Sequence, residues 1–323
     1  MRSLLIVNAD DFGISEGVNR GIVEAHLKGI LTSTTVMANM PAFEQAAQLR
    51  RDHPSLAAGV HLNLTAGNPL LPPHQLPSLV DREGHFLGGR RLLLGLTLGR
   101  VDLRQAEAEL SAQLERAISA GFSPDHLDSH HHLHCHPMLQ PIVVRLAQRY
   151  GIRAIRCPVE LNPAQLIPKP LHDTVGRGLV PRRPAPDVRS AAGDKPPPYL
   201  ENGAPPHRES PQRAHIKVVV LTSLGWLLRL RARRAGLLTT DHFRGLAIGL
   251  AFSSEELAET IRRLPAGSTE MMCHPGYPDS GLEAETSYAA GRDRELAALL
   301  DPNQRRHLQM GEVTPGSYSD LSG

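Results

Sequence analysis

Six of the chain's 17 histidines lie close together, in the run His-Leu-Asp-Ser-His-His-His-Leu-His-Cys-His-Pro at 126–137. Imidazole is the commonest metal ligand near neutral pH, and a carboxylate such as Asp128 can complete the sphere of zinc or of a harder ion. The alternative is a histidine tract, but such tracts usually lie among flexible residues at a terminus. This run contains the apolar Leu127 and Leu133 and precedes an apolar-periodic stretch at 138–150. It therefore favours a divalent metal site.

Two adjacent carboxylates, Asp10 and Asp11, follow a short apolar strand expected at 4–8. Folds of the α/β class place their sites at the carboxyl ends of strands. Beyond the strand, a turn would let both side chains approach one cavity, where one could bind metal while the other takes a proton. The competing interpretation is helix capping by Asp11 or Ser15, and this pair taken alone favours capping.

Two further histidines, His61 and His274, stand at the ends of other expected strands. Each taken alone is as well explained by a hydrogen-bonded core residue. Four strand candidates, however, each deliver an acid or an imidazole where the strand stops, and together they predict one constellation. The chain has no His-Glu-x-x-His, Cys-x-x-Cys, Walker or Gly-x-Ser-x-Gly motif, so serine or cysteine catalysis is unsupported.

Alternating short apolar runs and helical periodicity must position these residues. Strands are expected at 4–8, 33–37, 57–64, 126–129, 154–157 and 269–273, and helices at 16–28, 43–52, 103–120 and 221–230. Such alternation predicts an α/β fold with parallel strands and crossover helices. The segment 158–215 holds thirteen of the 27 prolines and little periodicity, which indicates an insertion or partly ordered loop. A lid over the site is the functional alternative. The closing stretch 311–321 shows no clear strand.

Composition excludes several classes of protein. A net charge of +2 without a basic block, and an aromatic content of 4%, argue against nucleic acid as a partner. Three cysteines cannot form a dense disulfide framework, which indicates a reducing compartment, by default the cytoplasm. The first apolar run is too short for a signal peptide, and no transmembrane segment is expected. The sequence leaves the oligomeric state open, a homo-oligomer included.

Five motifs together carry a resemblance: Leu-Ile-Val-Asn-Ala-Asp-Asp-Phe-Gly-Ile-Ser at 5–15, residues 32–35, Gly-Val-His-Leu-Asn-Leu-Thr at 59–65, the histidine run from 126, and Met-Cys-His-Pro-Gly at 272–276. In this order they resemble the YdjC-type carbohydrate deacetylases, over about the first 157 residues and again near 239–300. The resemblance implies a single domain over 1–323, an incomplete or distorted (β/α) barrel related to polysaccharide deacetylases. It also implies hydrolysis of an N-acetyl group from a sugar with the help of a divalent ion.

Carried over by position, the resemblance assigns Asp11, His61 and His130 as metal ligands, Asp10 as the general base and His274 as the general acid or substrate-orienting group. Residues expected to support the ligands or to contact substrate are Asp128, His132, His134, Asn63, Thr65 and Phe243. Two imidazoles and one carboxylate suit Zn²⁺ or Mg²⁺, and Mn²⁺ is also admitted.

The predicted function is a metal-dependent hydrolase that removes the N-acetyl group of an amino sugar, oligosaccharide or glycolipid. The sequence does not choose among these substrates. A metal-dependent phosphoesterase is the first alternative, but it should gather more carboxylates to hold two ions. A non-catalytic sugar- or metal-binding protein is the second, and it would not need Asp10 as a base beside the ligands.

Overall fold

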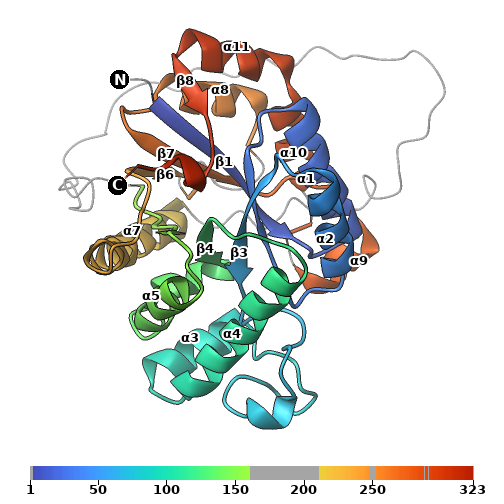
Figure 1. Cartoon of the computed structure of the whole chain (residues 1–323), viewed down its shortest axis with the longest axis vertical. Coiled ribbons are helices and arrows are strands. Elements are labelled where there is room, and N and C mark those ends of the chain that lie inside the picture. The colour runs from blue at the N-terminus through green and yellow to red at the C-terminus, as the bar shows by residue number, and fades with distance from the viewer. Residues whose placement is uncertain (1–2, 161–210, 247–251, 287, 290, 323) are drawn as a thin grey trace.

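A computed structural model describes residues 3–160, 211–246, 252–286, 288–289 and 291–322 (Figure 1). The first half of the chain forms β1 (Ser3–Phe12), α1 (Glu16–Lys28), β2 (Ser33–Val36), α2 (Phe43–Asp52), β3 (Ala57–Leu62), the 3-10 helix η1 (Pro73–Gln75), α3 (Gly89–Thr97), α4 (Leu103–Ser119), β4 (His126–Ser129) and η2 (His130–Cys135). The second half forms α5 (Gln140–Arg149), β5 (Ala154–Ile155), α7 (Pro211–Arg234), β6 (His242–Arg244), α8 (Ser254–Arg262), β7 (Ser268–Cys273), α9 (Ser280–Glu285), α10 (Arg292–Leu300), α11 (Pro302–Met310), β8 (Val313–Pro315) and η4 (Tyr318–Asp320).

The strands form one parallel sheet in the order β5-β4-β3-β2-β1-β7-β6, and β8 pairs with the start of β1. Its two ends approach one another at Leu238, which lies just before β6. The Leu238 amide donates to the Arg153 carbonyl at 2.8 Å, and the Ile155 amide donates to the Leu238 carbonyl at 3.0 Å. Helices surround the outside of this curved sheet (Figure 1). The expected α/β fold with an incomplete parallel barrel is confirmed.

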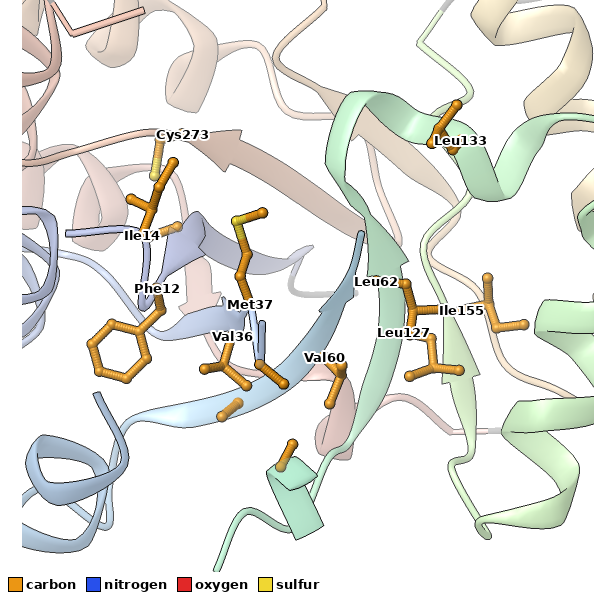
Figure 2. Close-up of a cluster of buried hydrophobic side chains, with 14 of the residues drawn as sticks. Phe12, Ile14, Val36, Met37, Val60, Leu62, Leu127, Leu133, Ile155 and Cys273 are labelled. Carbon is orange, nitrogen blue, oxygen red and sulfur yellow. The ribbon is translucent and has the colours of Figure 1, made fainter. Parts of the chain in front are cut away.

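The outer face of the sheet is apolar and packs against the helices. Figure 2 shows part of this layer, including Val60 and Leu62 of β3, Leu127 of β4 and Ile155 of β5. Each of these side chains is at most 1% exposed. Because successive strand residues point to opposite faces, the residues between them face into the barrel. The apolar periodicity of the strands thus also fixes which side chains reach the interior.

A smaller cluster closes the amino end of the barrel. It consists of Ile6, Ala154, Tyr318 and Leu321, all buried. The Tyr318 ring stacks on the His126 ring with centroids 3.8 Å apart, and its hydroxyl donates to Glu270. A Cβ at Gly59 would lie 2.6 Å from the His126 ring, so only glycine fits there. These side chains fill the amino end and leave the opposite end for the polar residues.

Most expected elements are confirmed, and α1, α2 and β4 have the expected bounds. The exceptions are instructive. Strand β1 continues to Phe12, so the aspartate pair lies inside the strand and not beyond its end, and β3 stops at Leu62. The expectation of no strand after 311 was wrong, because β8 (Val313–Pro315) adds to the exposed edge at the start of β1.

Residues 161–210 of the expected insertion at 158–215 lie outside the described residues. The insertion was expected to end at residue 215, but helix α7 already begins at Pro211. This helix also contains the helix expected at 221–230. None of the helices in the described part of the chain is long and apolar enough to cross a membrane. Cys135, Cys157 and Cys273 are buried and free, as expected for a chain without a disulfide framework.

Candidate metal centre

Asp11, His61 and His130 meet at the carboxyl end of the barrel, although they come from three separate elements. The Asp11 Oδ1 lies 3.1 Å from His130 Nδ1 and 3.5 Å from His61 Nε2. Ligand atoms that share a cation at about 2.0–2.2 Å lie a little over 3 Å apart. This Oδ1 is buried and has no hydrogen-bond partner. A buried carboxylate oxygen of this kind needs either a proton or a cation, so the three residues fit a metal ion.

A bulge in β1 lets two adjacent aspartates face the same interior. The register between β1 and β2 shifts between Ala9 and Phe12, and Asp11 has a left-handed backbone with φ of 70°. Such a conformation costs about 1–3 kcal/mol in a non-glycine residue and is concentrated at functional sites. In a regular strand Asp11 would point to the outer face. The sequence argument placed a turn beyond the end of the strand, whereas the irregularity lies within β1. Capping of α1 falls to Ser15, whose side chain accepts from the Val18 amide.

The orientation of the His61 ring is fixed by Asp128 on the neighbouring strand. Parallel pairing of β3 and β4 sets His61 directly beside Asp128, and its Nδ1 lies 2.7 Å from Asp128 Oδ1. The Thr35 hydroxyl donates to Asp128 Oδ2 at 3.2 Å. With Nδ1 protonated, Nε2 presents its lone pair toward Asp11, which is the usual arrangement of a metal-bound histidine. Burial alone would lower the pKa of His61, but Asp128 and Asp10 outweigh it and raise the pKa to about 9.

Of the six histidines in the run, only His130 belongs to this group of potential ligands. The next two, His131 and His132, have left-handed φ of 56° and 54°, so the chain turns sharply after His130. The His134 ring is held by the Ser129 hydroxyl and the Arg156 carbonyl, and burial lowers its pKa to about 4. His132 packs edge-on against Phe243. The histidine run therefore contributes one residue, His130, to this group of potential ligands.

Asp10 forms a two-point ion pair with Arg156, with both N–O distances 2.7 Å. The same guanidinium lies 2.6 Å from Asp128 Oδ2 and 2.7 Å from Glu270 Oε1, so it joins three carboxylates across the barrel. Phe243 lies beside it, 5.7 Å from ring centroid to guanidinium carbon. Burial acts to raise the pKa of Asp10, but Arg156 outweighs it and holds the pKa well below its usual range. Asp10 is therefore ionised and fixed in place.

The charges of this buried cluster also fit a cation. Its carboxyl groups are Asp10, Asp11, Asp128, Glu270 and Glu295, and its guanidinium groups are Arg156 and Arg292. Five carboxyl groups against two guanidinium groups leave an excess of acids in a region removed from water, which the His61 imidazolium and the raised pKa of Glu270 offset only in part in the metal-free protein. Buried charge of one sign is costly unless it is compensated. A divalent ion held by Asp11, His61 and His130 would compensate most of it.

His274 follows β7 directly, and β7 pairs with β1 up to Cys273 opposite Ala9. This register places His274 next to Asp10 on the neighbouring strand. Its side chain is 15% exposed, and its ring lies edge-on to Tyr288 with centroids 5.8 Å apart. Burial lowers the pKa of His274, although Glu295 and Asp10 oppose the shift. The expected acid thus stands beside the expected base.

Asn63 and Thr65 make hydrogen bonds within the turn that follows β3. The Asn63 Oδ1 accepts from the amides of Thr65 and Ala66, at 2.9 and 3.1 Å, and closes the turn after β3. The Thr65 hydroxyl lies 3.2 Å from His131 Nδ1. These bonds shape the rim of the barrel, and they do not bring either side chain to the three potential ligands.

Sequence reasoning missed Arg156, Arg292 and Glu270. Arg156 directly follows β5, but the strand was expected to run from 154 to 157, so Arg156 lay within it and not at its end. Glu270 lies in the middle of an expected strand and gave no signal beyond a charge among apolar residues. Arg292 donates to Asp11 Oδ2 at 2.6 Å from a helix that the periodicity did not predict.

Comparison with known proteins gives consistent matches. A family model described as YdjC-like protein matches residues 4–310. A carbohydrate deacetylase from Brevibacillus brevis is 49% identical over 317 residues, which cover 98% of this chain and 99% of the relative. One from Geobacillus stearothermophilus is 38% identical over 298 residues, which cover 92% and 89%. A solved structure from Enterococcus faecalis V583, provisionally described as a cellobiose-phosphate cleavage protein, matches over 100% of both chains with a TM-score of 0.70 and 25% identity.

Proposed function

Since the chain belongs to the YdjC-like family, we propose that it is a metal-dependent carbohydrate deacetylase, a hydrolase that removes an N-acetyl group from an amino sugar. The observation that carries the proposal is the unbonded Asp11 Oδ1 facing two imidazole nitrogens, with the ionised Asp10 next to it in the chain. The relation of this half-barrel to polysaccharide deacetylases is part of the same proposal.

Asp11, His61 and His130 would hold the ion. A bound divalent cation supplies Lewis acidity, which polarises an acetyl carbonyl and acidifies a water molecule. Three protein ligands leave coordination positions free for both groups. Two nitrogens and one oxygen suit Zn²⁺, while Mg²⁺ and Mn²⁺ would use the carboxylate together with waters.

Asp10 is the proposed general base. Arg156 keeps it ionised and aims it, so the carboxylate is ready to accept a proton without a change of conformation. The same ion pair makes Asp10 a weak base, and the transfer therefore depends on a water that is more acidic than bulk water. His274, at the end of the neighbouring strand β7, is the proposed acid that protonates the departing amine. One carboxylate and one imidazole would divide the two proton transfers.

The phosphoesterase alternative is less well supported. A second group, Asp10, His61 and Asp128, also has its ligand atoms within 4.8 Å of one another. It shares His61 with the first group, and both of its carboxylates are paired with Arg156. Two ions would compete for His61 and would lie close to the guanidinium, so the geometry favours one ion. The non-catalytic alternative leaves the alignment of Asp10 by Arg156 without a purpose.

Acetate release tests the proposal. The purified protein is incubated with N-acetylglucosamine, chitooligosaccharides, an N-acetylated glycolipid and a phosphorylated disaccharide, each with Mg²⁺, Zn²⁺ or Mn²⁺. We expect acetate from at least one N-acetylated sugar, and no acetate after chelation. Phosphate release without acetate would favour the phosphoesterase, and binding without either product would favour the non-catalytic alternative.

A further inference from the structure

The first turn of α10 carries two buried charges, Arg292 and Glu295, which are each 1% exposed. Residues three apart lie on the same face of a helix, and here that face is turned inward. Helix α10 packs against α1 and α8 beside the sheet (Figure 1). Buried charges are costly unless each is paired, and these two pair with different parts of the candidate site.

Arg292 contacts the carboxylate of Asp11. Its Nη2 donates to Asp11 Oδ2 at 2.6 Å, and its Nε donates to the Tyr288 carbonyl at 2.9 Å. The hydrogen bond to the Tyr288 carbonyl fixes the position of the Arg292 guanidinium. The guanidinium therefore does not move with the Asp11 carboxylate if that carboxylate rotates. Because Oδ2 is held in this way, Oδ1 is the oxygen left to face His61 and His130. Arg292 therefore decides which oxygen of Asp11 points to the ion.

Glu295 lies behind His274. Its Oε2 accepts from the His274 backbone amide at 2.7 Å and is 3.9 Å from His274 Nδ1. Its Oε1 accepts from the Tyr288 hydroxyl at 2.6 Å, and the Tyr288 ring packs edge-on against the His274 ring. The carboxylate holds the His274 backbone in place and puts a negative charge on the Nδ1 side of the ring, which favours the protonated imidazole. Glu295 and Tyr288 together set the position of His274.

On the premise of the proposed deacetylase function, we infer that the first turn of α10 is the positioning element of the site, with Arg292 aiming Asp11 at the ion and Glu295 aiming His274 at the departing amine. Both residues act through others and are positioning residues. Since they are one turn apart on a single helix, they fix the spacing between the metal ligand and the acid. The sheet alone does not fix this spacing, because Asp11 lies in a bulge of β1 and His274 lies beyond the end of β7.

The Glu295 half is tested by a double-mutant cycle with His274. We expect Glu295→Gln to lower kcat for acetate release about tenfold or more, with KM changed less than about threefold, because the acid is misaligned while substrate binding is spared. In a His274→Asn background, Glu295→Gln should have no further effect. Equal losses in both backgrounds would show a merely structural role and overturn the inference. If Glu295→Gln does not fold, Tyr288→Phe removes one of its hydrogen bonds and should show the same non-additivity at a smaller size.

The Arg292 half is tested by metal titration. Arg292→Lys keeps the charge but cannot contact Asp11 and the Tyr288 carbonyl in the same way, so Mn²⁺ affinity measured by calorimetry should fall about tenfold. Glu295→Gln, the matched control on the same turn, should leave this affinity within about threefold. Unchanged or tighter binding by Arg292→Lys would overturn its role. Wild-type protein that releases no acetate would refute the deacetylase proposal and the Glu295 half with it, whereas the metal titration would still decide the role of Arg292.

Discussion

Val60 and Leu62 of β3 and Leu127 of β4 belong to the apolar outer layer (Figure 2). His61 and Asp128, which alternate with them and pair across the two strands, face into the barrel. The outer layer requires only apolar side chains of suitable size. The inner layer requires particular atoms at particular distances, such as the 2.7 Å between His61 Nδ1 and Asp128 Oδ1. One strand thus serves packing on one face and chemistry on the other.

The two layers also differ in energy. Burying a leucine or valine side chain stabilises a fold by about 1.5–3 kcal/mol. Buried ion pairs such as Asp10 with Arg156 contribute little net stability, because the cost of removing both charges from water offsets their attraction. The polar interior is therefore better explained by function than by folding. Substitutions in the two layers should separate these effects.

The largest effect is expected from removing a ligand. His61→Ala and His130→Ala should each weaken metal binding by about a thousandfold or more, since even partners of ligands cost about 10–100-fold. Equilibrium dialysis with elemental analysis measures the bound metal. His136→Ala, in the same histidine run but outside the potential ligand group, is the matched control and should bind normally. Full metal content in both ligand variants would refute the assignment.

A large effect on rate alone is expected from Asp10→Asn. General base catalysis contributes about 10²–10⁴-fold, so kcat for acetate release should fall by that factor, while metal content stays near normal because the three ligands are intact. Both quantities are measured on the same preparation. Loss of metal together with activity would mean that the roles of Asp10 and Asp11 are reversed.

In the outer layer, Leu62→Ala should change stability and spare chemistry. Leu62 is 1% exposed, and truncating such a core leucine costs about 2–5 kcal/mol of unfolding free energy. Urea unfolding measures this change, and kcat per folded molecule should stay within about threefold. Leu94→Ala, at a side chain 59% exposed, is the control and should cost less than about 0.5 kcal/mol. A hundredfold loss of kcat in folded Leu62→Ala would contradict the claim that the outer layer contributes to stability and not to chemistry.

The smallest effect concerns pH. In the metal-free protein the pKa of His61 is raised from 6.5 to about 9, so its imidazolium stabilises the fold fully below pH 6.5. That contribution is lost as the pH rises through 9 and amounts to at most about 3 kcal/mol. Urea unfolding of metal-free protein from pH 6 to 9.5 should show the decline, and His61→Asn should lack it. A flat profile in the metal-free wild type would contradict the raised pKa.

Much of the outer layer could be predicted from the sequence, because apolar periodicity reports burial directly. It placed α1, α2 and β4 and the histidine-bearing ends of β3 and β7. It could not show that Asp11 adopts a left-handed conformation within β1, because a bulge depends on the neighbouring strand. Nor could it place Arg292 against Asp11, since contacts between residues 281 positions apart depend on how α10 packs against the sheet. The potential ligands were assigned through the family resemblance of local motifs, whereas the residues that contact them depend on tertiary structure.

The stacking of Tyr318 on His126, and its hydroxyl contact to Glu270, have a consequence for biosynthesis. Glu270 accepts from Arg156, and Arg156 donates to Asp10, so the position of Asp10 depends on a residue more than 300 positions later in the sequence. A ribosome-bound polypeptide cannot complete this relay until residue 318 has left the exit tunnel. Folding around Asp10 would thus wait for the η4 segment, and a substitution of Tyr318 would disturb the contacts that hold Asp10 in place.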